Sequence, residues 1–166
     1  MEFKKFNPIE KEFHFRLNEK SCYKCNCGVC SIEDLSIQDI KEYKVSVCIS
    51  KESEKEYCIK IAKSLLQYGC EDILHISRFN CGHYSLIEGQ HRICIVAHLL
   101  YKNANIELNA LTKTEDENCY YCVMLKKYND KLDSINAFQK IFKSKLLKEC
   151  TDNIKKLENY HILRKL

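Results

Sequence analysis

Three pairs of cysteines have the spacing with which a tight turn presents two thiolates to one metal ion. These pairs are Cys22 and Cys25, Cys27 and Cys30, and Cys119 and Cys122. Because two such pairs complete a tetrahedral site, the spacing predicts a structural Zn²⁺ with four thiolate ligands. The ligands that we expect are Cys22, Cys25, Cys119 and Cys122. Such a site would join the N-terminal segment to the end of the central part of the chain.

Other groupings of the same thiols remain open. Cys27 and Cys30 are alternates for the N-terminal half of the site. The four cysteines of residues 22–30 could also form a site alone, although so short a segment cramps the backbone. Two metal ions or an iron–sulfur cluster also fit the number of thiols, but the chain has no C-x2-C-x2-C run of the ferredoxin type.

Six further cysteines occur singly, and most of them are expected to be small buried hydrophobic residues. Cys48, Cys58, Cys94 and Cys150 fall inside predicted strands or helices. The turn sequence Cys81-Gly82-His83 is the exception, because a thiol beside an imidazole could form a catalytic pair. Four histidines are expected to be structural or surface residues: His14, His75, His98 and His161.

A short motif at residues 88–92, Glu-Gly-Gln-His-Arg, stands directly before an apolar helix, and we call it the box. The backbone N–H groups and the positive dipole end of a helix start form an anion site. Gly89 would let a ligand approach the backbone, and the guanidinium of Arg92 can bind two phosphate oxygens. Glu88 would hold a metal ion or accept a proton. The alternative is a capped helix start with His91 and Arg92 on the surface.

The elements that must position these residues read as α/β. Alternating and amphipathic patterns predict strands and helices in the middle of the chain. The expected order is strand 45–50, helix 52–68, strand 72–77, a turn at 80–82, strand 84–87, a buried helix 92–101, and strands 105–112 and 120–125. Residues 132–166 predict two helices, and Ser31 followed by Asp34 resembles a helix start. Residues 1–21 show no clear periodicity.

The order of these elements around the box resembles the ParB/sulfiredoxin superfamily, over about residues 44–125. The resemblance implies a small mixed sheet with helices, in which Gly89, Gln90, His91 and Arg92 bind nucleotide phosphates. Sulfiredoxins carry their reactive cysteine where this chain has Gln90, so that chemistry should be absent. ParB partition proteins usually carry arginine where His91 stands and continue into a helical DNA-binding domain. The box looks closer to the His-Arg members, which include free serine kinases.

The sequence therefore predicts an α/β (α+β) fold in one domain over residues 1–166. Within it we expect a Cys-rich, metal-stapled N-terminal segment at 1–43, a ParB/sulfiredoxin-like core at 44–125 and basic C-terminal helices at 126–166. The chain has 166 residues, 12 cysteines and a net charge of +4. Residues 126–166 hold 11 Lys and Arg against 5 Asp and Glu, or +6, and the remainder holds 16 against 18, or −2.

Composition also limits the compartment. No apolar run has the length of a signal peptide, and none approaches the roughly 20 residues of a membrane span. We therefore expect a cytoplasmic protein with no membrane partner, whose cysteines are reduced and not joined in disulfides. The sequence does not indicate an oligomeric state.

Two classes of function follow. The first is an enzyme that binds a nucleoside di- or triphosphate with Mg²⁺ and a small-molecule substrate, and transfers or hydrolyses a phosphoryl group. Glu88, His91 and Arg92 would be its catalytic residues, with Glu88 as general base or metal ligand. The second is a nucleic-acid-binding or nuclease module with structural zinc, which uses the basic C-terminal helices. A protein-interaction module that binds no nucleotide is a third alternative.

Overall fold

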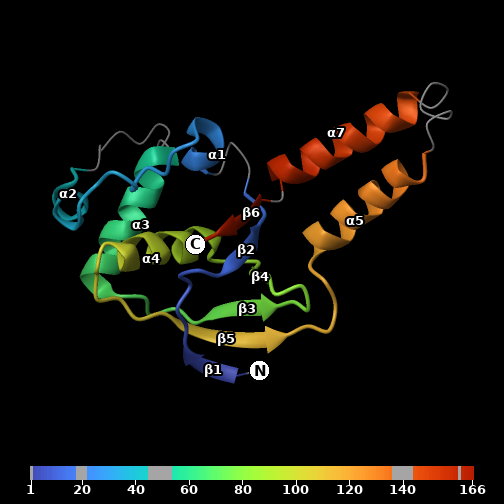
Figure 1. Cartoon of the computed structure of the whole chain (residues 1–166). Helices are drawn as coiled ribbons and strands as arrows, with labels where there is room; N and C mark the ends of the chain where they lie inside the picture. The colour runs from blue at the N-terminus through green and yellow to red at the C-terminus, as the bar shows by residue number, and fades with distance from the viewer. Residues whose placement is uncertain (1, 18–21, 45–53, 136–143, 161) are drawn as a thin grey trace.

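The computed structural model describes residues 2–17, 22–44, 54–135, 144–160 and 162–166. Its centre is a mixed six-stranded sheet in the order β1-β5-β3-β4-β2-β6 (Figure 1). The strands are β1 (Glu2–Lys5), β2 (Glu12–Phe15), β3 (Leu74–Arg78), β4 (Tyr84–Ser85), β5 (Asn109–Thr114) and β6 (Ile162–Lys165). β3 runs parallel to β5 and β2 parallel to β4, and the other neighbours are antiparallel. The predicted α/β fold with a mixed sheet is confirmed.

Two groups of helices accompany the sheet. The helices are α1 (Tyr23–Cys27), α2 (Ile37–Glu42), α3 (Glu54–Tyr68), α4 (Gln90–Tyr101), α5 (Tyr120–Asp133) and α7 (Ser144–Tyr160). α3 and α4 pack against each other beside the sheet, with α1 and α2 at the far end of α3 (Figure 1). α5 and α7 run side by side and project from the sheet. We call α5, α7 and Ile135 the arm, and the sheet with α1–α4 the body.

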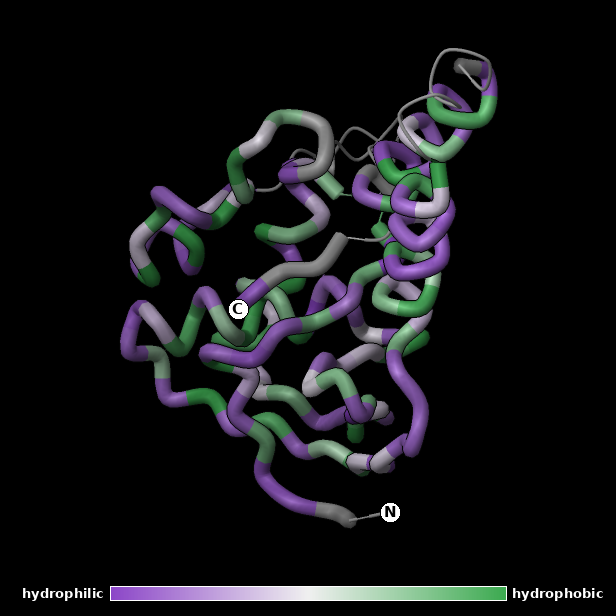
Figure 2. Tube along the Cα trace, turned by 45° about the vertical axis from the view of Figure 1, so that its right-hand side comes forward, coloured by the Kyte–Doolittle hydropathy of each residue, from purple (hydrophilic) through white to green (hydrophobic). Residues whose placement is uncertain are grey.

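The body has a continuous apolar core around α4. Ile93, Ile95, Val96 and Leu99 of this helix are almost fully buried, as its nearly all-apolar sequence predicts. They belong to one cluster with residues of α3 and of the central strands, such as Ile59. The arm is different, because α5 contains no buried residue. Hydrophilic and hydrophobic residues alternate along both arm helices (Figure 2), and only one side of each can be covered.

Two local predictions are wrong. Residues 120–125 were predicted as a strand but form the first turns of α5, because a short apolar run fits either period and here continues as a helix into charged residues. The predicted helix start at Ser31 and Asp34 is also displaced. The helix instead begins after Ser36, whose hydroxyl accepts the Asp39 N–H at 3.1 Å in a capping box with the same three-residue spacing.

Other predictions agree in type and differ in extent. β5 begins at Asn109, later than expected, and β4 has only two residues. The strands β1, β2 and β6 were not predicted. The predicted strand at 45–50, with Cys48, and most of the first C-terminal helix fall outside the described residues. Within the residues that the structure describes, no helix has the length and apolar character needed to cross a membrane.

Candidate metal centre

The turn between β3 and β4 lies against the start of α5. Gly82 closes this turn with φ +83°, and its N–H donates to the carbonyl of Phe79 at 2.9 Å. The N–H of Asn80 then donates to the carbonyl of Glu117 at 2.9 Å, which ties the turn to the segment before α5. Cys119 is the N-cap residue of α5 and Cys122 lies in its first turn. The backbone therefore brings two sequence motifs, Cys-x-His and Cys-x2-Cys, to one place.

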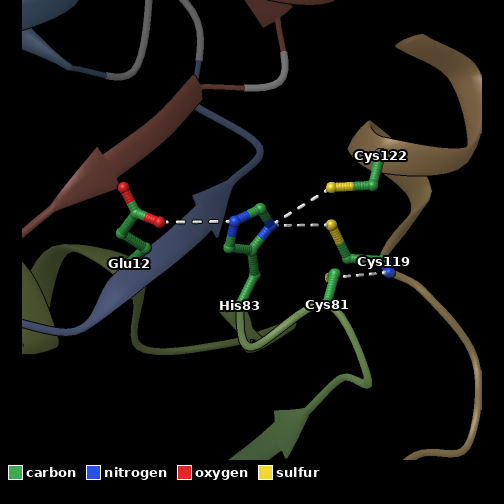
Figure 3. A network of polar contacts seen from close by, with 5 residues as sticks. All are labelled: Glu12, Cys81, His83, Cys119 and Cys122. Carbon is green, nitrogen blue, oxygen red and sulfur yellow. Dashed lines mark hydrogen bonds and ion pairs between the residues drawn. The ribbon is translucent and has the colours of Figure 1, made fainter. Parts of the chain in front are cut away.

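Four side chains from these motifs form a compact group that can hold a metal ion. One ligand atom from each of Cys81, His83, Cys119 and Cys122 lies within 4.8 Å of all the others. His83 Nδ1 is 3.4 Å from the Sγ of Cys119 and 3.3 Å from the Sγ of Cys122 (Figure 3). Cys119 is fully buried and the other three are partly buried. Three sulfurs and one imidazole nitrogen thus face a common centre.

The metal-free thiols do not ionise equally. Burial raises the pKa of Cys119, and burial together with the adjacent thiol of Cys119 raises the pKa of Cys122 to about 12. Burial also acts to raise the pKa of Cys81, but backbone N–H groups of Cys119 and His83 outweigh it, and the pKa is lowered. The Cys119 N–H lies 3.4 Å from the Cys81 sulfur. Cys81 is therefore the thiol best prepared to bind a cation first.

A carboxylate supports the imidazole from the opposite side. Glu12 of β2 places Oε2 3.3 Å from His83 Nε2, so both nitrogens of the ring are engaged (Figure 3). The His83 side chain is only 13% exposed. A hydrogen bond from the distal nitrogen to a carboxylate fixes the tautomer and orientation of a metal-binding histidine. Nδ1 is thereby left to face the sulfurs, as a metal ligand would.

The structure places only part of the predicted ligand set in this group. Cys119 and Cys122 are in it, but among the described residues their partners are Cys81 and His83, not Cys22. Cys22 lies in the body, close enough to act on the thiol of Cys58 in α3. Sequence spacing alone could not select the partners, because Cys22 lies at the start of α1, whereas it is β2 of the N-terminal segment that reaches the site, through Glu12. The short Cys-x-His spacing beside a glycine turn was the available signal.

The remaining predicted ligands are not in this group either. Cys27 is exposed and Cys30 is buried, and neither joins Cys119 and Cys122 among the described side chains. Nothing is described of the Cys25 side chain. The prediction that Cys58, Cys94 and Cys150 are buried is confirmed.

The box residues point in different directions. A cavity of about 510 Å³ adjoins the start of α4 and is lined by residues of β3, β4 and β5 together with Asp72, Glu88 and Arg92. Arg92 forms an ion pair with Asp72. Gly89 has φ +79°, and a Cβ there would lie 2.6 Å from Leu74 Cδ2. The positive φ and the packing of Leu74 therefore both favour glycine here, in addition to any need of a ligand.

Gln90 and His91 face away from the cavity. Gln90 Oε1 accepts the backbone N–H of Arg16 at 2.7 Å, which ties the box to the end of β2. His91 Nδ1 lies 3.5 Å from the sulfur of Cys58, and its ring meets the edge of Tyr57 at 5.2 Å between centroids. Of the side chains predicted to bind a nucleotide, only Arg92 lines the cavity. Glu88, which is predicted to be catalytic, lines the cavity as well.

Comparison of the chain with family models, with curated proteins and with solved structures gives no match.

Proposed function

We propose that the protein is a zinc-stapled α/β domain that binds the phosphates of a nucleotide with Mg²⁺ and transfers or hydrolyses a phosphoryl group. The observation that carries the proposal is the cavity of about 510 Å³ beside the start of α4. A volume of this size suits a small-molecule ligand. It combines the guanidinium of Arg92, the ammonium group of Lys113 and two carboxylates in one concave place.

The charges of the cavity fit a phosphate–metal pair. α4 begins beside the cavity, and its first N–H groups have no acceptor within the helix, although Gly89, Gln90 and His91 do not line the cavity themselves. Arg92 adds a cation that can fork onto phosphate oxygens. The carboxylates of Glu88 and Asp72 would attract Mg²⁺, which is usually bound through one or two carboxylates and substrate phosphates. Asp72 also competes with phosphate for Arg92, through the ion pair described above.

The metal centre would be a structural zinc site. Three thiolates and one imidazole are a common closed ligand set for Zn²⁺. Glu12 provides the outer hydrogen bond that such a histidine ligand requires. The metal would join the β3–β4 turn to the first turn of α5 and so hold the arm on the body.

Nucleotide binding is tested by thermal shift with ATP, ADP and CTP in Mg²⁺. A ligand that binds only the folded protein raises its melting temperature with concentration. We expect at least one nucleotide to stabilise the wild type, Arg92→Ala to lose this shift, and Asp72→Asn to keep or increase it. Arg78→Ala is the matched control, because Arg78 is an exposed arginine of β3 that does not line this cavity.

Turnover is tested separately by nucleotide hydrolysis and by phosphoryl transfer to small acceptors. Glu88→Gln should keep the thermal shift and lose turnover if Glu88 is the base. The proposal fails if no nucleotide shifts the wild type, or if Arg92→Ala responds as the wild type does.

A second candidate function is nucleic-acid binding, and a basic groove that shares Lys113 with the cavity favours it. This groove of about 770 Å³ contains five cations and no carboxylate in its lining: Lys4, Lys5, Lys11, Arg78 and Lys113. The rings of Phe6 and Tyr84 also line it, and Lys11 Nζ lies 5.3 Å from the centroid of the Phe6 ring. Phe6 belongs to the buried core, so the partly exposed Tyr84 is the ring that would stack on a base while the cations contact phosphates.

The two candidates are separated by reciprocal variants. Nucleic-acid binding predicts an oligonucleotide affinity that falls with salt, is reduced by Arg78→Ala and is unchanged by Arg92→Ala. The nucleotide site predicts the opposite pattern for the nucleotide-induced thermal shift. Truncation of the basic arm tests the remaining version, in which the C-terminal helices bind the nucleic acid.

A further inference from the structure

The outer face of β3 carries a histidine that lines the cavity. His75 lies between Leu74 and Ile76, which are only 3% and 1% exposed and belong to the main apolar cluster. Successive side chains of a strand point to opposite faces of a sheet. The exposed imidazole of His75 therefore points away from that core, and it lines the cavity of about 510 Å³.

The strand register places a polar row beside this histidine. Ser77 follows on the same face, and it lies opposite Ser85 of β4 and Lys113 of β5. His75 itself lies opposite Leu111 of β5. All five residues line the cavity. The floor of the cavity is thus one face of three neighbouring strands, and the imidazole belongs to the central strand of the three (Figure 1).

The two carboxylates of the cavity belong to its other end, around Arg92. Asp72 forms an ion pair with Arg92, and Glu88 precedes Arg92 by four residues in the segment that leads into α4. His75 follows Asp72 by three residues, which is about 10 Å of extended chain. This separation leaves room for a phosphoryl group between a cation at the carboxylates and the imidazole.

The imidazole is available for chemistry. No hydrogen bond or ion pair with a described residue engages the His75 ring. By contrast, Glu115 holds the ammonium group of Lys113 at 2.8 Å and accepts the hydroxyl of Ser77 at 3.1 Å. Arginine and lysine stay protonated near neutral pH, whereas an imidazole titrates there and can accept a proton. Among the basic side chains of the cavity, His75 is therefore the one suited to take a proton.

We propose that His75 is the general base of the phosphoryl transfer and that Glu88, together with Asp72, holds Mg²⁺. This inference rests on the proposed nucleotide site, and it decides between the two roles expected for Glu88. A carboxylate beside Mg²⁺ is a poor base, because the cation favours its charged form. An imidazole at some distance from the cation does not have this disadvantage.

The step is a displacement at the terminal phosphorus of the nucleotide. A water molecule or the hydroxyl of a small acceptor gives its proton to the His75 ring while its oxygen bonds to that phosphorus. The bond from the phosphorus to the bridging oxygen breaks, and the shortened nucleotide leaves with the electron pair of that bond. Arg92 would face the charge that develops there. The imidazolium then returns its proton to solvent.

This role predicts a particular dependence on pH. The imidazole accepts a proton only when it is neutral, so turnover should fall as the pH drops below neutral, and the fall should be absent from the residual activity of His75→Gln. The charged groups on the elements around His75 are Asp72 before β3, Glu88 before α4, Arg92 on α4, and Lys113 with Glu115 at the end of β5.

The test compares three variants with the wild type in the full chain. His75→Gln should keep the thermal shift with ATP, ADP or CTP in Mg²⁺ and lower turnover by about 100-fold or more. Glu88→Gln should lose the part of the shift that depends on Mg²⁺. His98→Gln is the matched control, because this half-buried histidine of α4 does not line the cavity.

A second measurement does not depend on turnover. The NMR signals of the His75 ring, assigned by their loss in His75→Gln, should move when a non-hydrolysable nucleotide is added with Mg²⁺, and those of His98 should not. The inference is overturned, while nucleotide binding stands, if the nucleotide binds without moving these signals, if the wild type shows no turnover, or if His75→Gln keeps full turnover. A wild type that no nucleotide stabilises would instead overturn the nucleotide site and this inference together.

Discussion

The body and the arm are held in different ways. In the body, α4 is buried on nearly all sides between α3 and the sheet. In the arm, α5 has no buried residue, and the buried residues of the described arm are Ile135, Cys150 and Leu157. The main apolar cluster does not include these three. The arm instead meets the body at one end, where Cys119 and Cys122 face Cys81 and His83, His14 of β2 lies against Tyr120 and Tyr121, and α7 contacts β6.

A metal ion at the proposed site would let four side chains do the work of a larger apolar contact. Complete burial of one large apolar side chain contributes about 1.5–3 kcal/mol. A structural zinc ion contributes an apparent binding energy of about 10–16 kcal/mol in small domains. One proposed metal can therefore stabilise the attachment of α5 as strongly as several buried leucines. Apolar burial should therefore determine the stability of the body. Metal coordination should determine how firmly the arm is attached.

The largest effect is expected from loss of the metal ion proposed at Cys119 and its partners, because the arm should then loosen while the body stays folded. Cys119→Ala should lose one metal ion per chain and release α5 from the β3–β4 turn. Amide hydrogen exchange of residues 120–133 should then accelerate by orders of magnitude, while that of α4 changes little. Cys150→Ala, which removes a buried thiol from the arm without touching the site, is the control. Equal acceleration in α4 and α5 would show that arm and body unfold as one unit.

The next largest effect is expected from shortening buried side chains, which should cost more unfolding free energy in the body than in the arm. Ile93→Ala leaves a cavity at a fully buried position of α4 and should lower the free energy of unfolding by about 3–5 kcal/mol. Leu157→Ala should cost about 2 kcal/mol, because the smaller contact between α5 and α7 can collapse around the gap. Urea unfolding followed by circular dichroism gives both values. A larger loss for Leu157→Ala would contradict the difference between the cores.

Alanine substitution of two glycines compares a crowded position in the body, Gly89, with an open position in the β3–β4 turn, Gly82. Both have positive φ, +79° at Gly89 and +83° at Gly82, so alanine costs about 1–2 kcal/mol of backbone strain at each. At Gly89 the added Cβ also meets the buried Leu74 side chain, whereas nothing lies within 4 Å of Gly82. Gly89→Ala should therefore be about 1–3 kcal/mol more destabilising than Gly82→Ala in thermal or urea unfolding. Equal losses would mean that Leu74 moves without cost.

Local patterns predicted the parts of the fold that depend on nearby residues. α3, α4 and β3 follow from periodicity, although their bounds differ by a few residues. β1 and β6 could not be found in this way, since each is short and pairs with a distant strand. Glu2 lies opposite Thr112, and Phe15 lies opposite Ile162. α5 was misread because its first six residues are too few to distinguish a strand from a helix.

The candidate site shows the same limit. The spacing of Cys119 and Cys122 identified one half of it correctly. The other half is Cys81 and His83, which are remote in sequence and reach the first pair only through the β3–β4 turn. The sequence predicts that Gly89 allows close approach of a ligand, whereas in the structure its positive φ and the packing of Leu74 already favour a glycine. Spacing within one turn is local, whereas the meeting of two turns depends on the sheet.

The smallest expected effect concerns Glu12 of the body, which contacts His83, a ligand of the proposed metal ion. Glu12→Gln keeps the length of the side chain but removes the charge opposite His83 Nε2. Loss of such an outer-shell partner typically lowers metal affinity by about 10–100-fold. Competition with a zinc chelator measures this change, and Glu117→Gln, an exposed acid before α5, is the control. Since β2 belongs to the body, a lower metal affinity in Glu12→Gln would show that the sheet contributes to metal binding at the start of the arm. An unchanged affinity would mean that the four ligands alone determine how tightly the metal binds, without a contribution from β2.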